Sequence, residues 1–236
     1  MKYIITHKDF DLPLFTKEDY TVICPKGVTV SNWKNVEYFD NGLDNRMWSE
    51  IAAMKWIADN SNEDWIQINH YRRILDEFPC HCCMAEPMIF QNMNLAQHYS
   101  LYHNIDDLSI CSGIIKELYP DLYNIWIQTL NSNVFMPYNM LQLPKDCFKD
   151  YMTKMYTILS KILELYLIEN YEDMLKYIEL KPVYSENNNA RNTDPVYQAR
   201  LIAFLSERIT TWYMNCLTVS NAVLYPCRVA KYENAF

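Results

Sequence analysis

Two adjacent arginines follow a histidine in the segment NHYRR, residues 69–73. An arginine fork can hold two phosphate oxygens at once and keeps its charge at any relevant pH, so the cluster suits a diphosphate ligand. The alternating residues EDWIQIN before it predict a strand over Glu63–Asn69, ending just before His70. Ligands of open α/β sheets bind at the carboxyl ends of strands. We therefore expect an anion site at His70, Arg72 and Arg73, with a solvated basic loop as the alternative.

His7 and Lys8 form a second cationic pair, directly after a β-rich run at Lys2–Thr6. In a parallel sheet, the end of that strand faces the same side as His70. The pair is therefore expected close to the NHYRR cluster.

Arg200 and Glu207 lie seven residues apart in a helix predicted from Pro195 to about Leu217. At about 100° per residue they point within roughly 20° of each other. Glu207 could then accept the proton of an acceptor hydroxyl or position sugar hydroxyls, whereas a purely structural ion pair is the alternative. A separate stripe is apolar and is expected to face the core: Leu201, Leu205, Ile209, Trp212 and Cys216.

Two further clusters resemble metal sites. Residues 80–83 (CHCC) hold four ligand types, but a structural zinc usually takes two separated pairs, so buried thiols are the favoured interpretation. His98 and His103 precede Asp106 and Asp107, which would suit a metal-dependent phosphohydrolase. Helix-capping aspartates and surface histidines are the favoured alternative.

The elements that must position these residues alternate between strands and helices. Strands are expected at Lys2–Thr6, Thr21–Cys24, Glu63–Asn69, Met88–Phe90, Asn139–Leu143 and Ala222–Tyr225. Helices are expected at Arg46–Asn60, Leu95–Tyr102, Asp106–Tyr119, Pro120–Asn131, from Pro144 onward and from Pro195. The polar run at 185–194 is the most linker-like stretch. The pattern predicts the α/β class.

The composition of the chain excludes several classes of function. The 236 residues suit one domain, and the net charge of -8 argues against nucleic acid as a partner. The eight cysteines, without a leader-like N-terminus, suggest reduced thiols in the cytoplasm. The chain has only three glycines, and it contains no P-loop, no dinucleotide-binding GxGxxG motif and no GxSxG nucleophile elbow. No apolar run is long enough to span a membrane.

Several segments together resemble the bacterial capsule and exopolysaccharide glycosyltransferases that contain domain of unknown function 4422. The resemblance covers most of the chain and keeps the family's order. It rests on THK at 6–8, LDN at 43–45, SEIAAMKWIADN at 49–60, INHYRRILD at 68–76, HNIDDL at 103–108, MPYNM at 136–140 and FLSER at 204–208.

The resemblance implies a GT-A-like, Rossmann-type fold in a single domain over 1–236, with a nucleotide-binding half over about 1–93 and a helix-rich acceptor half over about 94–236. It implies a nucleotide diphosphate donor, such as a UDP-sugar or UDP-galactofuranose, and an inverting mechanism. The acceptor would be a polysaccharide or a lipid-linked oligosaccharide. The expected location is cytoplasmic, with peripheral contact at the inner membrane face left open. The alternative is a non-catalytic protein that binds a nucleotide sugar or a glycan and has kept the fold without the transfer activity.

The resemblance also suggests roles for individual residues. His7, Lys8, Asp44 and Asn45 would frame the nucleotide. NHYRR occupies the place of the usual Asp-x-Asp metal motif but has no carboxylate, so arginine would replace the cation, or manganese or magnesium would bind elsewhere. The remaining expectations are Tyr138, Asn139, Arg200 and Arg208 as substrate contacts, and Glu207 as the base with Asp194 as its rival.

Overall fold

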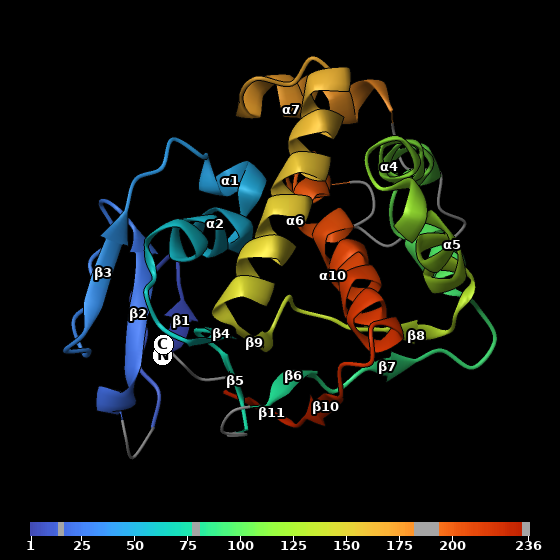
Figure 1. Cartoon of the computed structure of the whole chain (residues 1–236). Helices are drawn as coiled ribbons and strands as arrows, with labels where there is room; N and C mark the ends of the chain where they lie inside the picture. Colours follow the sequence, from blue (N-terminus) through green and yellow to red (C-terminus); the bar gives the residue numbers. More distant parts are fainter. Residues whose placement is uncertain (14–16, 77–80, 182–193, 233–236) are drawn as a thin grey trace.

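A central mixed sheet organises the computed structural model, which describes residues 1–13, 17–76, 81–181 and 194–232 (Figure 1). The first part of the sheet is parallel. Its strands are β1 (Lys2–Ile5), β2 (Tyr20–Pro25), β3 (Val36–Phe39) and β4 (Trp65–His70), in the order β4-β1-β2-β3. The carboxyl ends of β1 and β4 are neighbours, because Ile5 is paired with His70.

Strands from later in the chain extend the same sheet beyond β4. β9 (Leu141–Pro144) runs antiparallel to β4 and to β6 (Cys82–Ala85), and β10 (Leu224–Cys227) lies parallel to β6. β5 (Arg73–Leu75) pairs with β4 and with β11 (Val229–Lys231). A separate antiparallel pair contains β7 (Met88–Ile89) and β8 (Val134–Phe135). The sheet thus draws strands from both ends of the chain, and the predicted α/β class is confirmed.

The helices gather on one side of the sheet, with α6 and α10 running through the middle of the molecule (Figure 1). α6 packs against α2, α4 and α10. The helices are α1 (Asn45–Trp48), α2 (Glu50–Asn60), α3 (Leu95–Ser100), α4 (Ile105–Leu118), α5 (Tyr123–Asn131), α6 (Lys145–Leu165), α7 (Tyr171–Leu180), α9 (Pro195–Gln198) and α10 (Leu201–Val219), with short 3-10 turns η1 (Lys17–Asp19) and η2 (Pro120–Leu122).

Side chains of the sheet alternate between two cores, because successive residues of a strand point to opposite faces. Tyr3 and Ile5 of β1 join the large core with the helices, whereas Ile4 joins a smaller core. Loop residues Phe10 and Trp33 stack on each other in that smaller core. Helices therefore cover one face at β1, and loops cover the other.

Two predicted helices are interrupted. The helix predicted over Arg46–Asn60 breaks at Ser49, whose φ of 48° lies in the left-handed region that non-glycine residues rarely adopt. The helix predicted from Pro195 divides into α9 and α10 on either side of Arg200. The residues before 194 in the predicted linker lie outside the described part of the chain.

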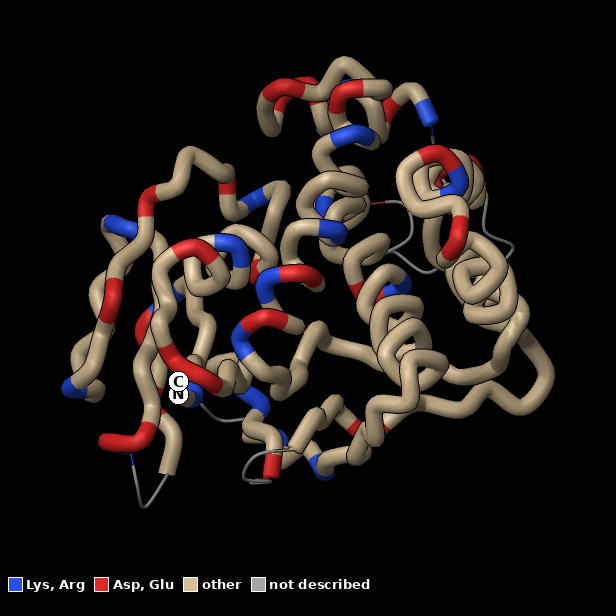
Figure 2. Tube along the Cα trace, viewed as in Figure 1, with Lys and Arg blue, Asp and Glu red and all other residues tan. Residues whose placement is uncertain are grey.

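Acidic and basic residues are distributed over both the strands and the helices (Figure 2). The net negative charge is therefore not confined to one element. Within the described ranges, no helix combines the length and the apolar character needed to cross a lipid bilayer. The seven described cysteines are free thiols.

Candidate functional site

A cavity of about 820 Å³ opens at the carboxyl ends of β1 and β4. Its lining contains five arginines and only two glutamates, although the whole chain carries a charge of -8. The residues are Ile5, Thr6, His7, Asn45, Arg46, Ser49, Glu50, His70, Tyr71, Arg72, Arg73, His98, Tyr102, His103, Phe135, Tyr138, Tyr197, Arg200, Ala203, Phe204, Glu207 and Arg208. The acidic protein thus concentrates positive charge where an anion could bind.

The strand wall of this cavity comprises residues 5–7 and 70–73, which follow or end β1 and β4. Arg72 is exposed, and the guanidinium of Arg73 lies 4.3 Å from the centre of the Tyr138 ring. Burial is the largest cause of the lowered pKa of His70, and Arg73 lowers it further. Among the described residues, His70 Nε2 and Arg73 Nε are buried without a hydrogen-bond partner. These groups are available to a ligand.

Two of the predicted nucleotide contacts lie outside the lining. Lys8 places its Nζ 5.3 Å from the Tyr71 ring centre. Asp44 caps α1 by accepting the backbone N–H of Arg46 at 2.9 Å, and it also pairs with the Arg46 guanidinium. That side-chain bond is the main cause of the lowered pKa of Asp44. Asn45 and Arg46, next to it, do line the cavity.

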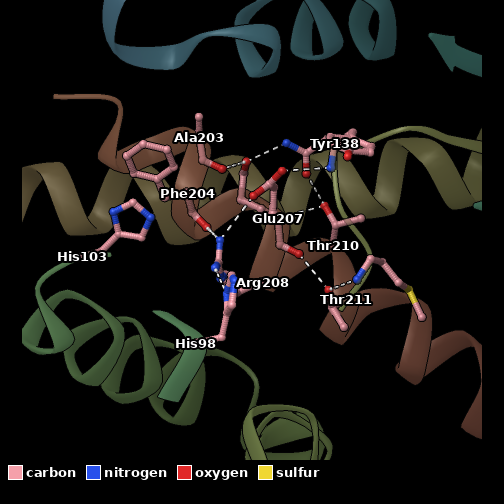
Figure 3. A network of polar contacts seen from close by, with 12 residues as sticks. His98, His103, Tyr138, Ala203, Phe204, Glu207, Arg208, Thr210 and Thr211 are labelled. Carbon is pink, nitrogen blue, oxygen red and sulfur yellow. Dashed lines mark hydrogen bonds and ion pairs between the residues drawn. The ribbon is translucent and has the colours of Figure 1, made fainter. Parts of the chain in front are cut away.

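A second group of lining residues, here called the helix wall, consists of Tyr138 and the α10 residues Ala203, Phe204, Glu207 and Arg208. The Glu207 side chain is 21% exposed. Its carboxylate accepts the backbone N–H of Tyr138 at 2.9 Å and lies 3.3 Å from an Arg208 nitrogen (Figure 3). Burial raises the pKa of Glu207, and the Arg208 charge opposes this effect. Glu207 is thus a fixed carboxylate that faces the cavity.

Arg208 was expected to contact substrate, but its side chain is only 2% exposed. It donates to the Phe204 carbonyl at 2.9 Å and lies 3.1 Å from Nδ1 of His98 (Figure 3). Burial and the Arg208 charge lower the pKa of His98 to about 4, so its neutral ring can accept this bond. The guanidinium also lies 4.6 Å from the Phe135 ring centre. These contacts make Arg208 a residue that positions Glu207.

Asn139 was also expected at the substrate, but it is fully buried and does not line the cavity. Its amide nitrogen donates to Glu50 and Ser206, each at 2.8 Å. Tyr138 does line the cavity. Both residues have left-handed φ values, 74° for Tyr138 and 52° for Asn139. Such strained backbone concentrates at functional sites.

Of the remaining predicted residues, some line the cavity and others do not. Arg200 and Glu207 both line the cavity, as their helical spacing suggested. Asp194, the predicted rival base, is exposed, caps α9 by accepting the Val196 N–H at 3.0 Å, and is not part of the lining. The sequence prediction missed Glu50 and Arg46. The available signal was their position within five residues after LDN, in the first turns of two helices.

The described part of the chain does not assemble a metal site from the predicted clusters. It contains no group of three or more histidine, cysteine, aspartate or glutamate side chains that could hold an ion. His103 instead stacks on Phe204 at 3.9 Å and contacts Gln198, while Asp107 accepts from Tyr166 at 2.7 Å. The contacts of His103 and Asp107 therefore do not form the phosphohydrolase centre that the sequence offered as an alternative.

Comparisons with known proteins agree with this architecture. Residues 78–178 match the family model described as a domain of unknown function, DUF4422. A search of curated proteins finds no match. The solved structure of WbbM, a bifunctional glycosyltransferase in its apo form, superposes with a TM-score of 0.71 over 99% of this chain at 16% identity. The predicted GT-A-like fold is thereby confirmed. This chain spans only 45% of the WbbM chain.

Proposed function

We propose that this protein is a glycosyltransferase that takes a sugar from a nucleotide diphosphate donor, with UDP-sugars and UDP-galactofuranose as the leading candidates. The observation that carries the proposal is the cavity itself, where Arg72 and Arg73 line the strand wall and Glu207 lines the helix wall in a protein of net charge -8. Arginines bind phosphate oxygens with a geometry that carboxylates and neutral groups cannot provide. The fold shared with WbbM supports the same assignment.

In the proposed reaction, a hydroxyl of a polysaccharide or lipid-linked oligosaccharide attacks the anomeric carbon of the donor. Glu207 accepts the proton of that hydroxyl as the new glycosidic bond forms and the bond to the diphosphate breaks. Arg72 and Arg73 stabilise the negative charge that develops on the departing diphosphate. A single displacement of this kind inverts the anomeric configuration.

The arrangement of the chain follows from this proposal. Residues 1–93 would supply most of the nucleotide contacts, and residues 94–236 would supply the base and the acceptor contacts. We place the reaction in the cytoplasm, where nucleotide sugars are made, with the acceptor presented at the inner membrane face.

The proposal is tested first by thermal unfolding with UDP, GDP, CMP and several UDP-sugars, each with and without manganese. A ligand that binds only the folded protein raises its melting temperature. We expect UDP compounds to stabilise the protein selectively, and Arg72→Ala or Arg73→Ala to weaken their binding by about tenfold or more, because each removes a charge-assisted hydrogen bond.

Arg228→Ala is the matched control, because Arg228 is exposed and does not line this cavity. It should keep the affinity of the parent protein for UDP. Absence of a shift with every nucleotide would contradict the proposal. Binding of UDP-sugars without transfer or hydrolysis would instead identify a non-catalytic binding protein.

A further inference from the structure

Glu50 is the second carboxylate of the cavity, and the proposed reaction leaves it without a task. It is the first residue of α2 and follows the strained Ser49. One of its oxygens accepts from the Asn139 amide at 2.8 Å. This bond ties the start of α2 to the loop that carries Tyr138, so Glu50 has a defined direction in the cavity.

A buried chain of hydrogen bonds fixes Asn139 and, through it, Glu50. The Thr210 hydroxyl donates to Asn139 Oδ1 at 2.6 Å and contacts the Tyr151 hydroxyl at 2.7 Å. Asn139, Thr210 and Tyr151 are at most 2% exposed. Buried networks whose groups are satisfied are rigid, and they hold the residue at their end in one orientation. Glu50 is thus a preorganised acceptor and not a mobile surface charge.

Glu50 lines the same cavity as His70 and Glu207. Adjacent residues of one loop hold the two carboxylates, because the Tyr138 N–H donates to Glu207 and the Asn139 amide donates to Glu50. A ligand that extends from the arginines toward Glu207 would therefore pass beside Glu50.

The chemistry of a nucleotide sugar determines which part can lie there. The diphosphate is anionic and would be repelled by a carboxylate, whereas the sugar is neutral and carries several hydroxyl donors. A carboxylate forms strong hydrogen bonds with hydroxyl groups. Because Glu207 is assigned to the acceptor hydroxyl, Glu50 is the carboxylate that can accept hydrogen bonds from the donor sugar.

We infer that Glu50 binds hydroxyl groups of the donor sugar and thereby contributes to donor selection. The inference rests on the proposed function. A site that accepts a hydrogen bond from a particular hydroxyl discriminates against analogues without it, because the carboxylate oxygen facing the ligand would then lose that bond. Donors that lack the hydroxyl facing Glu50 should bind no better than UDP.

Calorimetric titration of UDP and of UDP-glucose, UDP-galactose, UDP-galactofuranose and UDP-N-acetylglucosamine tests the inference. The quantity compared is the ratio of the Kd of UDP to the Kd of the best-bound UDP-sugar. Glu50→Gln should reduce this ratio by about tenfold or more, because it removes a charge-assisted bond to the sugar. Binding of UDP itself should be unchanged or tighter, because a negative charge has left the cavity.

Glu117→Gln is the matched control, because it removes the same charge from an exposed position on α4 outside the cavity. It should leave the ratio unchanged. If Glu50→Gln does not fold, Glu50→Asp keeps the charge and shortens the side chain by one methylene, and it should reduce the ratio by a smaller factor.

The outcomes separate the two proposals. An unchanged ratio in Glu50→Gln, or equal weakening of UDP and UDP-sugar, would overturn the role of Glu50 and leave the glycosyltransferase proposal intact. A parent protein that binds neither UDP nor any of the UDP-sugars would overturn both.

Discussion

The strand wall and the helix wall of the cavity hold their charges in opposite ways. On the strand wall, Arg72 is exposed, and polar atoms of His70 and Arg73 have no partner among the described residues. On the helix wall, Glu207 accepts the Tyr138 N–H and pairs with Arg208, which donates to the Phe204 carbonyl although its Nε has no partner among the described residues.

This difference corresponds to different chemical tasks. Polar groups contribute most to the affinity for a charged ligand when they have no hydrogen-bond partner within the protein, because the ligand then supplies the missing bonds. A carboxylate that must accept a proton gains from a fixed position and a raised pKa. The comparison can be tested by altering one wall at a time.

The largest effect is expected from Glu207→Gln on the helix wall. The amide keeps the shape of the side chain but cannot accept the proton, so transfer should slow by about 10²- to 10⁴-fold. Binding of UDP should remain, since the strand wall is intact. Steady-state rates together with UDP titration check both parts, and a variant with the parent rate would show that Glu207 is not the base.

The next largest effect is expected from Arg208→Met, which should lower the free energy of unfolding. Removing Arg208 leaves the partly exposed Glu207 carboxylate without its charged partner, which should cost less than the ~3–5 kcal/mol typical of fully buried pairs. Urea unfolding measures this change. The exposed Arg228→Met should have little effect. A loss for Arg208→Met no greater than that of the control would show that Arg208 does not support the helix wall.

A smaller effect, on the pH dependence of the stability, is expected from His103, which lies next to the helix wall. Burial and the Arg208 charge lower its pKa to about 3, from an ordinary value of 6.5. The unfolded chain therefore takes up a proton below pH 6.5 that the folded chain refuses, so stability falls as the pH drops from 6.5 toward 3. One such group contributes a slope of about 1.4 kcal/mol per pH unit.

His103→Gln should reduce that slope, because glutamine does not titrate. Urea unfolding at pH 7 and at pH 5 gives the comparison, with the parent protein as reference. Some slope should persist in the variant, since His98 also has a lowered pKa. Equal slopes for parent and variant would contradict the buried, neutral state of His103.

His70, Arg72 and Arg73 lie within four residues at the end of a strand, so a local pattern and a rule about parallel sheets were enough to expect them in one cavity. Tyr138 and Glu207 line the same cavity. Of the other expected substrate contacts, Asn139 lies outside the cavity lining, and Arg208 lines it with a side chain that is only 2% exposed. Burial decides whether a polar side chain faces a ligand or supports a neighbour. No local pattern distinguishes those two cases.

By itself, the sequence determined the α/β class, most of the longer elements and the cluster of cations after β4, because these depend on periodicity within a few residues. Only the tertiary structure brought Glu50, Asn139 and Thr210 into one network, and Glu207 into contact with Tyr138. The bonded partners lie 69 to 89 positions apart in the chain. The physical reason is that these contacts depend on how α2 and α10 pack against each other and against the loop before β9, which no short segment encodes.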